Sequence, residues 1–318
     1  MDDRRLLSPT GTKLEPLEKQ IYQRLKQFRP QFKERALITA VSGGIDSVSL
    51  LYVLKSLETR LGYKLYIAHI NHTVRGKASD RDARFVMTLS RQMKIPISMK
   101  KLKGISKNVG ENQLRQARYT MLFELKKKLR ASFIVTAHHQ DDLLETRLMR
   151  LLQGTGIHGL RAMTLLSDDG IFRPFLFNTR RDIEIYAKTK DLAWRNDATN
   201  EDTTKLRNWI RRNWLAVLRN EHPEYQKNLA LSLERLVQSN PIPAPASDLT
   251  FDRSQLRTAH ESEMDLRIHS YLRYHGQARV TSRHVSEFKK QILSKKKYFI
   301  FRLAGVNWRV EKNLVQPL

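Results

Sequence analysis

Residues 42–47 read S-G-G-I-D-S and directly follow a short apolar run that is typical of a buried strand. Gly43 and Gly44 lack a Cβ, so a turn here can take positive φ and bring backbone N–H groups close to a ligand. A helix that begins at the turn would direct the positive end of its dipole at the same place. We predict that this loop binds the phosphates of a nucleotide through Ser42, Gly43, Gly44, Ile45, Asp46 and Ser47. The alternative is an ordinary strand–helix turn in which Ser and Asp cap the helix.

A second group of polar side chains lies at the end of the predicted strand of residues 64–70 and directly after it. His69, Asn71, His72 and Arg75 lie there, and ligands of parallel sheets bind beyond the carboxyl ends of strands. We therefore expect His69 to line the nucleotide site. A polar strand exit with satisfied histidines is the alternative.

A third group follows the predicted strand of residues 132–137. His138 and His139 precede a helix that carries Asp142 and Glu145 three residues apart, on one face of its first turn. The alternative is that the two acids only stabilise the helix, because negative charges in a first turn interact favourably with the helix dipole. A metal site built from these residues with His69 and His72 is a further alternative, although no spacing such as H-E-x-x-H supports it.

Arg118 lies on or beside the apolar stripe of a helix predicted for residues 111–129. It stands four residues from both Leu114 and Leu122, which belong to that stripe. A guanidinium in such a place needs an anion, because burial of an unpaired charge is costly. The anion is either a ligand or an acid within the fold.

Strands and helices alternate around these groups. Helices are predicted for residues 14–28, 80–93, 111–129 and 143–153, and strands for residues 36–41, 64–70, 95–102 and 132–137. This alternation predicts an α/β fold with a doubly wound parallel sheet. Prolines at 241, 243 and 245 indicate a linker, followed by helices at 264–274 and 284–293 and a hairpin around Ala304 and Gly305. We divide the chain into a catalytic domain with a basic helical extension, residues 1–225, and a linker with a small C-terminal α+β domain, residues 226–318.

The charge of the chain points to a polyanionic partner. Lys and Arg number 58 against 32 Asp and Glu, a formal net charge of +26, and a helix predicted for residues 205–220 interleaves arginines with tryptophans. This pattern suits phosphate contacts and base stacking in a nucleic acid, although a solvated basic face is the alternative. No cysteine is present, which excludes disulfides, Fe–S clusters and cysteine catalysis. No apolar leader or membrane-spanning run is evident, so we expect a cytoplasmic protein without a membrane partner.

Several motifs together resemble a known family. S-G-G-I-D-S resembles the loop of the N-type ATP pyrophosphatases, the PP-loop superfamily. G-E-N-Q-L-R-Q-A-R-Y, T-A-H-H-Q-D-D-L-L-E-T, Q-G-T-G-I-H-G-L, R-P-F, D-A-T-N and R-N-W-I-R then follow in the order found in tRNA(Ile)-lysidine synthetases, over roughly two thirds of the chain. Ala198 stands where that family often has Ser, and Gln140 where Leu is usual.

The resemblance implies an adenine nucleotide α-hydrolase-like fold and a tRNA-modifying ligase. ATP with Mg²⁺ would adenylate the C2 oxygen of the wobble cytidine in the CAU-anticodon isoleucine tRNA, and the ε-amine of free L-lysine would displace AMP. Asp46 would lie near the metal and the phosphates. The resemblance implies lysine binding by Arg118, Asp142 and Glu145, and the basic helix predicts tRNA binding by Arg207, Asn208, Arg211 and Arg212.

The lysine amine must lose a proton before it attacks, because its ordinary pKa is about 10.4. Asp46 and Asp142 are both candidates for this catalytic role. The main alternative function is a tRNA thiolase of the same superfamily, which the absence of cysteine disfavours. A small-metabolite ligase would not need such a charge, and a non-catalytic RNA-binding protein would not need the phosphate loop. The sequence leaves a homodimer open.

Overall fold

The computed structural model describes residues 13–71, 77–101, 111–195, 206–239, 251–254, 261–275 and 280–318. His72, the three linker prolines and the D-A-T-N motif lie outside these ranges. The chain forms two compact units, Met1–Thr146 with Met163–Arg212 and Arg147–Ala162 with Asn213–Leu318. The division into functional domains between residues 225 and 226 stays a prediction.

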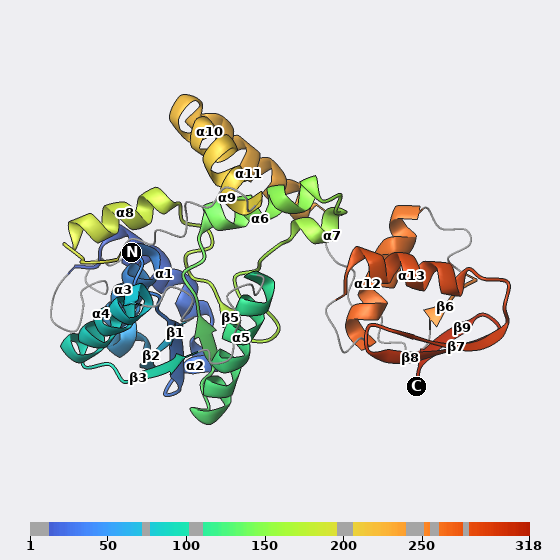
Figure 1. Ribbon diagram of the computed structural model, residues 1–318, viewed down its shortest axis with the longest axis horizontal. Coiled ribbons are helices and arrows are strands. Elements are labelled where there is room, and N and C mark those ends of the chain that lie inside the picture. The colour runs from blue at the N-terminus through green and yellow to red at the C-terminus, as the bar shows by residue number, and fades with distance from the viewer. Residues whose placement is uncertain are drawn as a thin grey trace. The chain divides into compact units, whose positions relative to one another are not determined.

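A five-stranded parallel sheet forms the centre of the first unit, in the order β3-β2-β1-β4-β5 (Figure 1). Its strands are β1 (Ala36–Ala40), β2 (Lys64–Asn71), β3 (Ile97–Lys101), β4 (Phe133–Val135) and β5 (Ile171–Phe172). Each neighbouring pair is parallel, with Ile38 of β1 opposite Tyr66 of β2 and Ile134 of β4. The doubly wound sheet predicted from the sequence is thus confirmed. The short β5 was not predicted, because two residues carry no periodicity.

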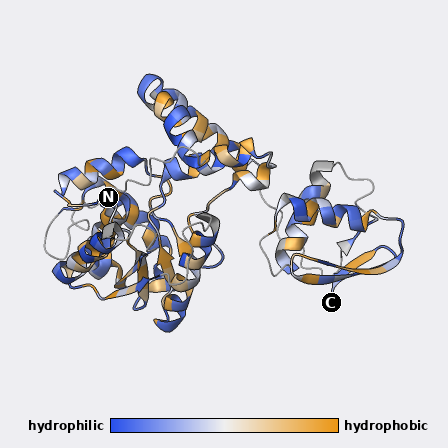
Figure 2. Cartoon of the chain, viewed as in Figure 1, coloured by the Kyte–Doolittle hydropathy of each residue, from blue (hydrophilic) through white to orange (hydrophobic). Residues whose placement is uncertain are grey.

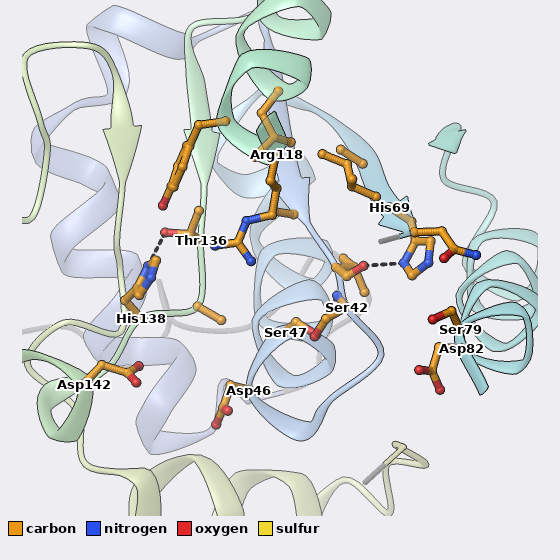
Figure 3. A pocket seen from close by; sticks show the side chains of 18 residues that line it. Ser42, Asp46, Ser47, His69, Ser79, Asp82, Arg118, Thr136, His138 and Asp142 are labelled. Carbon is orange, nitrogen blue, oxygen red and sulfur yellow. Dashed lines mark hydrogen bonds between the residues drawn. The ribbon is translucent and has the colours of Figure 1, made fainter. Parts of the chain in front are cut away.

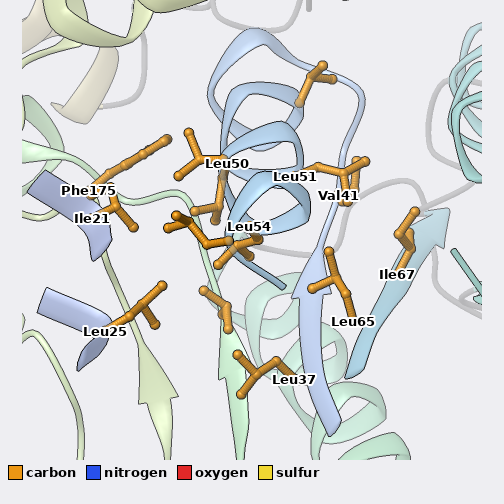
Figure 4. Packing of buried hydrophobic residues seen from close by; sticks show 14 of the residues in the cluster. Ile21, Leu25, Leu37, Val41, Leu50, Leu51, Leu54, Leu65, Ile67 and Phe175 are labelled. Atoms are coloured by element: carbon orange, nitrogen blue, oxygen red, sulfur yellow. The ribbon is translucent and has the colours of Figure 1, made fainter. Parts of the chain in front are cut away.

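Helices cover both faces of this sheet because alternate strand residues point to opposite sides. Leu37 packs into the larger core together with Leu50, Leu54 and other apolar residues of the neighbouring helices (Figure 4). Ile38, one residue later, packs on the other face with Leu122. The larger core is built by α1 (Pro16–Gln27), α2 (Arg29–Phe32), α3 (Ile45–Leu61), α4 (Lys77–Met93) and α8 (Arg180–Thr189), and the opposite one by α5 (Glu111–Lys128).

Further helices lie between residues 140 and 238. They are α6 (Gln140–Leu152), α7 (Ile157–Leu160), α9 (Leu206–Trp209), a π-helical turn (Ile210–Leu215), α10 (Ala216–Glu221) and α11 (Pro223–Gln238). The prediction of one regular helix over residues 205–220 is therefore wrong in one respect, since a π-helical turn interrupts it. Such turns are frequent at functional sites.

The C-terminal residues form a separate core under a four-stranded sheet in the order β6-β9-β8-β7. Its elements are β6 (Phe251–Asp252), α12 (Glu261–His275), α13 (Ser282–Ile292), β7 (Tyr298–Leu303), β8 (Val306–Glu311) and β9 (Leu314–Pro317). The predicted hairpin is confirmed, and Ala304 and Gly305 at its tip have φ of 52° and 84°, as a tight hairpin turn requires. Trp308 is fully buried between this sheet and the two helices.

Hydropathy follows this architecture. Orange apolar residues gather on the central strands, whereas α8 is largely blue (Figure 2). Among the described helices, none combines the length and the apolar character that a membrane-spanning segment needs.

Candidate active site

A cavity of about 260 Å³ opens at the carboxyl ends of β1, β2 and β4, where a ligand of a doubly wound sheet is expected (Figure 3). It brings together residues from all three predicted groups. The polar side chains along its wall are those of Ser42, Asp46, Ser47, His69, Asn71, Ser79, Asp82, Arg118, Tyr119, Thr136, His138 and Asp142.

The loop between β1 and α3 is held by its own serines. Ser47 Oγ donates a hydrogen bond to the carbonyl of Gly44 at 2.9 Å and accepts hydrogen bonds from the N–H groups of Ser42 and Gly43 at 3.1 and 3.3 Å. Gly43 has φ of 99°, which favours glycine, whereas Gly44 has φ of −72°, which any residue can adopt. Only one of the two glycines therefore meets the conformational requirement that the sequence suggested for both.

His69 lines the cavity, and its two ring nitrogens have different surroundings. Its Nδ1 lies 2.8 Å from the carbonyl oxygen of Val41, which fixes the tautomer with the proton on Nδ1. Nε2 is buried and has no hydrogen-bond partner among the described residues. Burial lowers the pKa of His69, so the ring is neutral and Nε2 can accept a hydrogen bond.

Asp46 lies in the first turn of α3, at the floor of the cavity. Arg180 Nη1 of α8 contacts its Oδ2 at 2.5 Å, and His139 Nε2 lies 3.9 Å from its Oδ1. Oδ1 is buried and accepts no hydrogen bond from the part of the chain that the structure describes. Burial raises the pKa of Asp46, and His139 and Arg180 oppose that shift. An oxygen left without a donor at a phosphate loop fits a cation that accompanies the nucleotide.

Asp142 forms the opposite side of the cavity floor, at the start of α6. The backbone N–H of His139 donates to its Oδ2 at 3.1 Å, and His139 Nε2 lies 3.4 Å from the same oxygen. Burial alone would raise its pKa, but His139 and His138 and the hydrogen bond from the His139 N–H hold the pKa of Asp142 below its ordinary value. The carboxylate is therefore ionised at neutral pH and can hold an ammonium group.

His138 is kept neutral in the cavity wall. Its Nδ1 lies 2.8 Å from Thr136 Oγ1. Burial, with repulsion from Arg173, Arg115 and Arg118, lowers the pKa of His138 to about 3, although Asp142 opposes the shift. His138 is therefore neutral at pH 7 and adds no positive charge beside Arg115 and Arg118.

Arg118 projects from α5 into the cavity (Figure 3). Its guanidinium lies over the ring of Tyr119, 5.5 Å from the ring centroid. Asp142 contacts His139, and Glu145 contacts arginines of the basic helix. The prediction that Arg118 binds the anion of a ligand stays a prediction.

Glu145 is 1% exposed and is not among the cavity-lining residues. Arg211 Nε donates to Oε1 at 2.6 Å and Arg211 Nη2 to Oε2 at 2.9 Å, while Arg207 Nε lies 3.3 Å from Oε2. Burial raises the pKa of Glu145, and the two arginines oppose this. Arg211 also lies 3.5 Å from Asp142 Oδ1, so it joins the two acids. A direct contact between Glu145 and lysine stays a prediction.

The four predicted tRNA-binding residues have different surroundings. Arg207 Nη2 donates to Thr146 Oγ1 at 2.7 Å, Arg211 binds Glu145, and Asn208 is 8% exposed. Arg212 is exposed. Their role in RNA binding stays a prediction, and Arg212 is the member whose side chain is open to a large partner.

Sequence reasoning missed Arg180. Position 180 lies outside every motif that drew attention, and the only signal for it is that α8 begins soon after the R-P-F segment. The metal alternative includes His72, which lies outside the described ranges; within those ranges, no group of three or more His, Asp or Glu side chains is arranged to hold a metal.

Comparisons with known proteins agree with this geometry. The PP-loop domain family matches residues 17–218. A tRNA(Ile)-lysidine synthase of Bdellovibrio bacteriovorus is 30% identical over 299 residues, which cover 89% of this chain and 92% of that protein. One of Porphyromonas gingivalis is 38% identical over 216 residues, 65% of this chain but 46% of that protein, so the chain spans about half the length of that relative. The U34-tRNA thiolase NcsA of Methanococcus maripaludis, solved with its [4Fe-4S] cluster, is 15% identical with a TM-score of 0.56 over 76% of this chain and 85% of that one, which shows a shared fold.

Proposed function

The chain belongs to the tRNA(Ile)-lysidine synthase family of PP-loop proteins, and we propose that it joins lysine to C2 of the wobble cytidine in the isoleucine tRNA with a CAU anticodon. ATP would first adenylate the C2 oxygen, and lysine would then displace AMP. The observation that carries this proposal is one cavity that joins a phosphate loop, Arg118 and Asp142. These are the groups needed for a nucleotide, an α-carboxylate and an ammonium.

The nucleotide would lie against the loop of residues 42–47 and His69. The loop N–H groups and the N-terminus of α3 favour phosphate oxygens, and the free Nε2 of His69 can accept a hydrogen bond from a donor such as an adenine amine. Asp46 would hold the Mg²⁺ that accompanies ATP, and that ion would supply neutralising charge at the phosphates.

Lysine would bind between α5 and α6. The Arg118 guanidinium can hold an α-carboxylate through two parallel hydrogen bonds, and Asp142 remains ionised to hold an amine. We propose that Glu145 supports this pocket as an ionised carboxylate that keeps Arg211 beside Asp142. Asp46 and Asp142 both stay candidates for the proton acceptor.

The tRNA would be drawn by charge and held by exposed basic and aromatic side chains. Arg212 is exposed, and Trp209 and Trp214 expose 39% and 42% of their surface. Exposed indole rings can stack on unpaired bases, and arginines neutralise phosphates.

A thiolase is the alternative within the superfamily. The thiolase of the same fold was solved with a [4Fe-4S] cluster, and such clusters are held by cysteine thiolates. This sequence contains no cysteine, which favours the ligase.

The proposal is tested with the full chain, ATP, Mg²⁺ and a CAU-anticodon tRNA transcript. Each radiolabelled amino acid is added in turn, and incorporation into tRNA is measured together with release of AMP and pyrophosphate. We expect lysine alone to be incorporated, with one AMP formed per lysine. Equal incorporation of arginine or ornithine, or AMP release without any incorporation, would contradict the proposal.

A further inference from the structure

Arg180 occupies the carboxylate that the proposed function assigns to the nucleotide's metal. Its Nη1 contacts Asp46 Oδ2 at 2.5 Å, and its Nε binds Glu184 Oε1 at 3.0 Å, one turn along α8. The Arg180 and Asp46 side chains remain 34% and 27% exposed. An ion pair this exposed adds little to stability, so holding the fold together is a weak explanation for it.

The backbone that carries Arg180 is firmly anchored beside the phosphate loop. Thr179 caps α8 by accepting a hydrogen bond from the Asp182 N–H at 3.1 Å. The carbonyl of Asn178 accepts a hydrogen bond from the Gln140 N–H at 2.8 Å, at the start of the helix that carries Asp142. The backbone of Arg180 is thus fixed beside the start of the helix that carries Asp142, and its guanidinium reaches Asp46 through a long side chain.

Arg180 binds Oδ2 of Asp46, and a cation would bind Oδ1 of the same carboxylate, so the two positive charges would lie close together and repel each other. When Asp46 binds the metal of the nucleotide, its pair with Arg180 weakens, and Arg180 keeps Glu184 while its Nη1 is close to the arriving phosphates. A guanidinium binds phosphate oxygens through paired hydrogen bonds in a way that an ammonium does not. The phosphates nearest to Asp46, beyond the loop of residues 42–47, are then its natural partners.

We propose that Arg180 binds the pyrophosphate part of ATP and exchanges Asp46 for it when the nucleotide enters. In the adenylation step, the C2 oxygen of cytidine forms a bond to Pα while the bond from Pα to the bridging oxygen breaks. The bridging oxygen keeps the electron pair and leaves on pyrophosphate. Arg180 neutralises the charge that develops there, an effect that counts most in the transition state.

This inference rests on the proposed function, and its test separates the two. The affinities of the full chain for Mg²⁺-pyrophosphate and for AMP are measured by calorimetry, without tRNA or lysine, for wild type, Arg180→Ala, Arg180→Lys and the control Arg181→Ala. Arg181 is the exposed neighbour on the same helix. If the wild type binds pyrophosphate but incorporates no lysine, the proposed ligase function is refuted, whereas the proposed role of Arg180 in pyrophosphate binding is not.

We expect Arg180→Ala to weaken pyrophosphate binding by at least about tenfold, because a hydrogen-bonded charge is lost, and to change AMP binding by less than about twofold. Arg180→Lys keeps the charge without the paired geometry and should show a smaller loss. Arg181→Ala should leave both affinities unchanged. Pyrophosphate affinity in Arg180→Ala within about twofold of wild type, or an equal loss for AMP, would overturn the inference. If Arg180→Ala does not fold, unchanged pyrophosphate affinity in Arg180→Lys would overturn it.

Discussion

Arg211 donates two parallel hydrogen bonds to Glu145, from Nε to Oε1 at 2.6 Å and from Nη2 to Oε2 at 2.9 Å. Glu145 is 1% exposed, so its carboxylate depends on this partner and on Arg207. We predict that Arg211→Ala lowers the free energy of unfolding by about 1–3 kcal/mol, less than for a fully buried pair because Arg211 remains partly exposed. Urea unfolding measures this change.

Arg212→Ala is the matched control for Arg211→Ala. Arg212 is the exposed neighbour in the same π-helical turn, and its removal should change stability by less than about 0.5 kcal/mol. The same variant should weaken tRNA binding if the prediction for Arg212 is correct. Equal stability losses in the two variants would show that Arg211 does not hold Glu145 in solution.

Asp46→Asn should remove adenylation and leave the fold intact. The amide cannot hold the Mg²⁺ of ATP as a carboxylate does, so we expect ATP–pyrophosphate exchange to fall by at least about 100-fold. The lost pair with Arg180 is partly exposed, so stability should change by less than about 1 kcal/mol. Exchange, tRNA affinity and thermal unfolding are measured on one preparation, and normal exchange would reject the assignment of Asp46.

Arg118→Ala should raise the KM for lysine at least about tenfold while adenylation without lysine persists, because a charged hydrogen-bond partner contributes about 1.5–3 kcal/mol. Arg115→Ala is the control. Arg115 lies one turn earlier on α5, with its guanidinium over the same Tyr119 ring at 5.2 Å, but it does not line the cavity. If Arg118→Ala loses both half-reactions and also melts at a lower temperature, Arg118 stabilises the fold and does not bind lysine.

The lysines at 295, 296 and 297 form an exposed turn that a buried arginine holds in place. Arg253, 2% exposed, donates to the carbonyls of Ile292 and Lys296 at 3.1 and 2.9 Å. If this turn contacts tRNA phosphates, changing all three lysines to Gln should weaken tRNA binding and flatten the slope of log affinity against log salt by about 2. Filter binding at several salt concentrations measures the slope, and an unchanged slope would exclude the turn from the interface.

Because the pKa of the buried His138 is lowered, we expect the protein to lose stability in acid. The folded-state pKa of His138 is about 3 because of burial, and the ordinary value is about 6.5. The unfolded chain therefore takes up the proton first, so stability is complete above about pH 6.5 and falls as the pH drops toward 3. Between pH 7 and pH 5 the wild type should lose about 1–2 kcal/mol more than His138→Gln. Parallel pH dependences of the two proteins would contradict a neutral buried His138.

Much of the parallel sheet was predictable because its strands and helices carry strong local patterns. Residues 36–41 are apolar apart from Thr39, and the stripe on α5 repeats at helical spacing, so both elements follow from local sequence patterns. β5 has two residues and depends on Ile171 and Phe172 pairing with β4, a long-range contact with no local signature. The π-helical turn also gave no sequence signal.

The sequence predicted which residues form the site, but it did not predict which of their side chains pair with one another. Asp46, Arg118 and Asp142 line one cavity because they follow or flank strands that share an edge. The sequence could not show that Arg211 reaches back 66 residues to Glu145, or that Arg180 reaches Asp46 across 134. Both pairs depend on long side chains whose directions are set by tertiary packing.

The central claim is that lysine becomes attached to one cytidine of the tRNA. The most direct measurement is mass spectrometry of nucleosides digested from a CAU-anticodon tRNA(Ile) transcript after incubation with the full chain, ATP, Mg²⁺ and lysine. The account predicts one cytidine that has gained the mass of lysine less one water, in an amount equal to the AMP released, and none when lysine is omitted. A complete set of unmodified cytidines in a reaction that consumes ATP would contradict it.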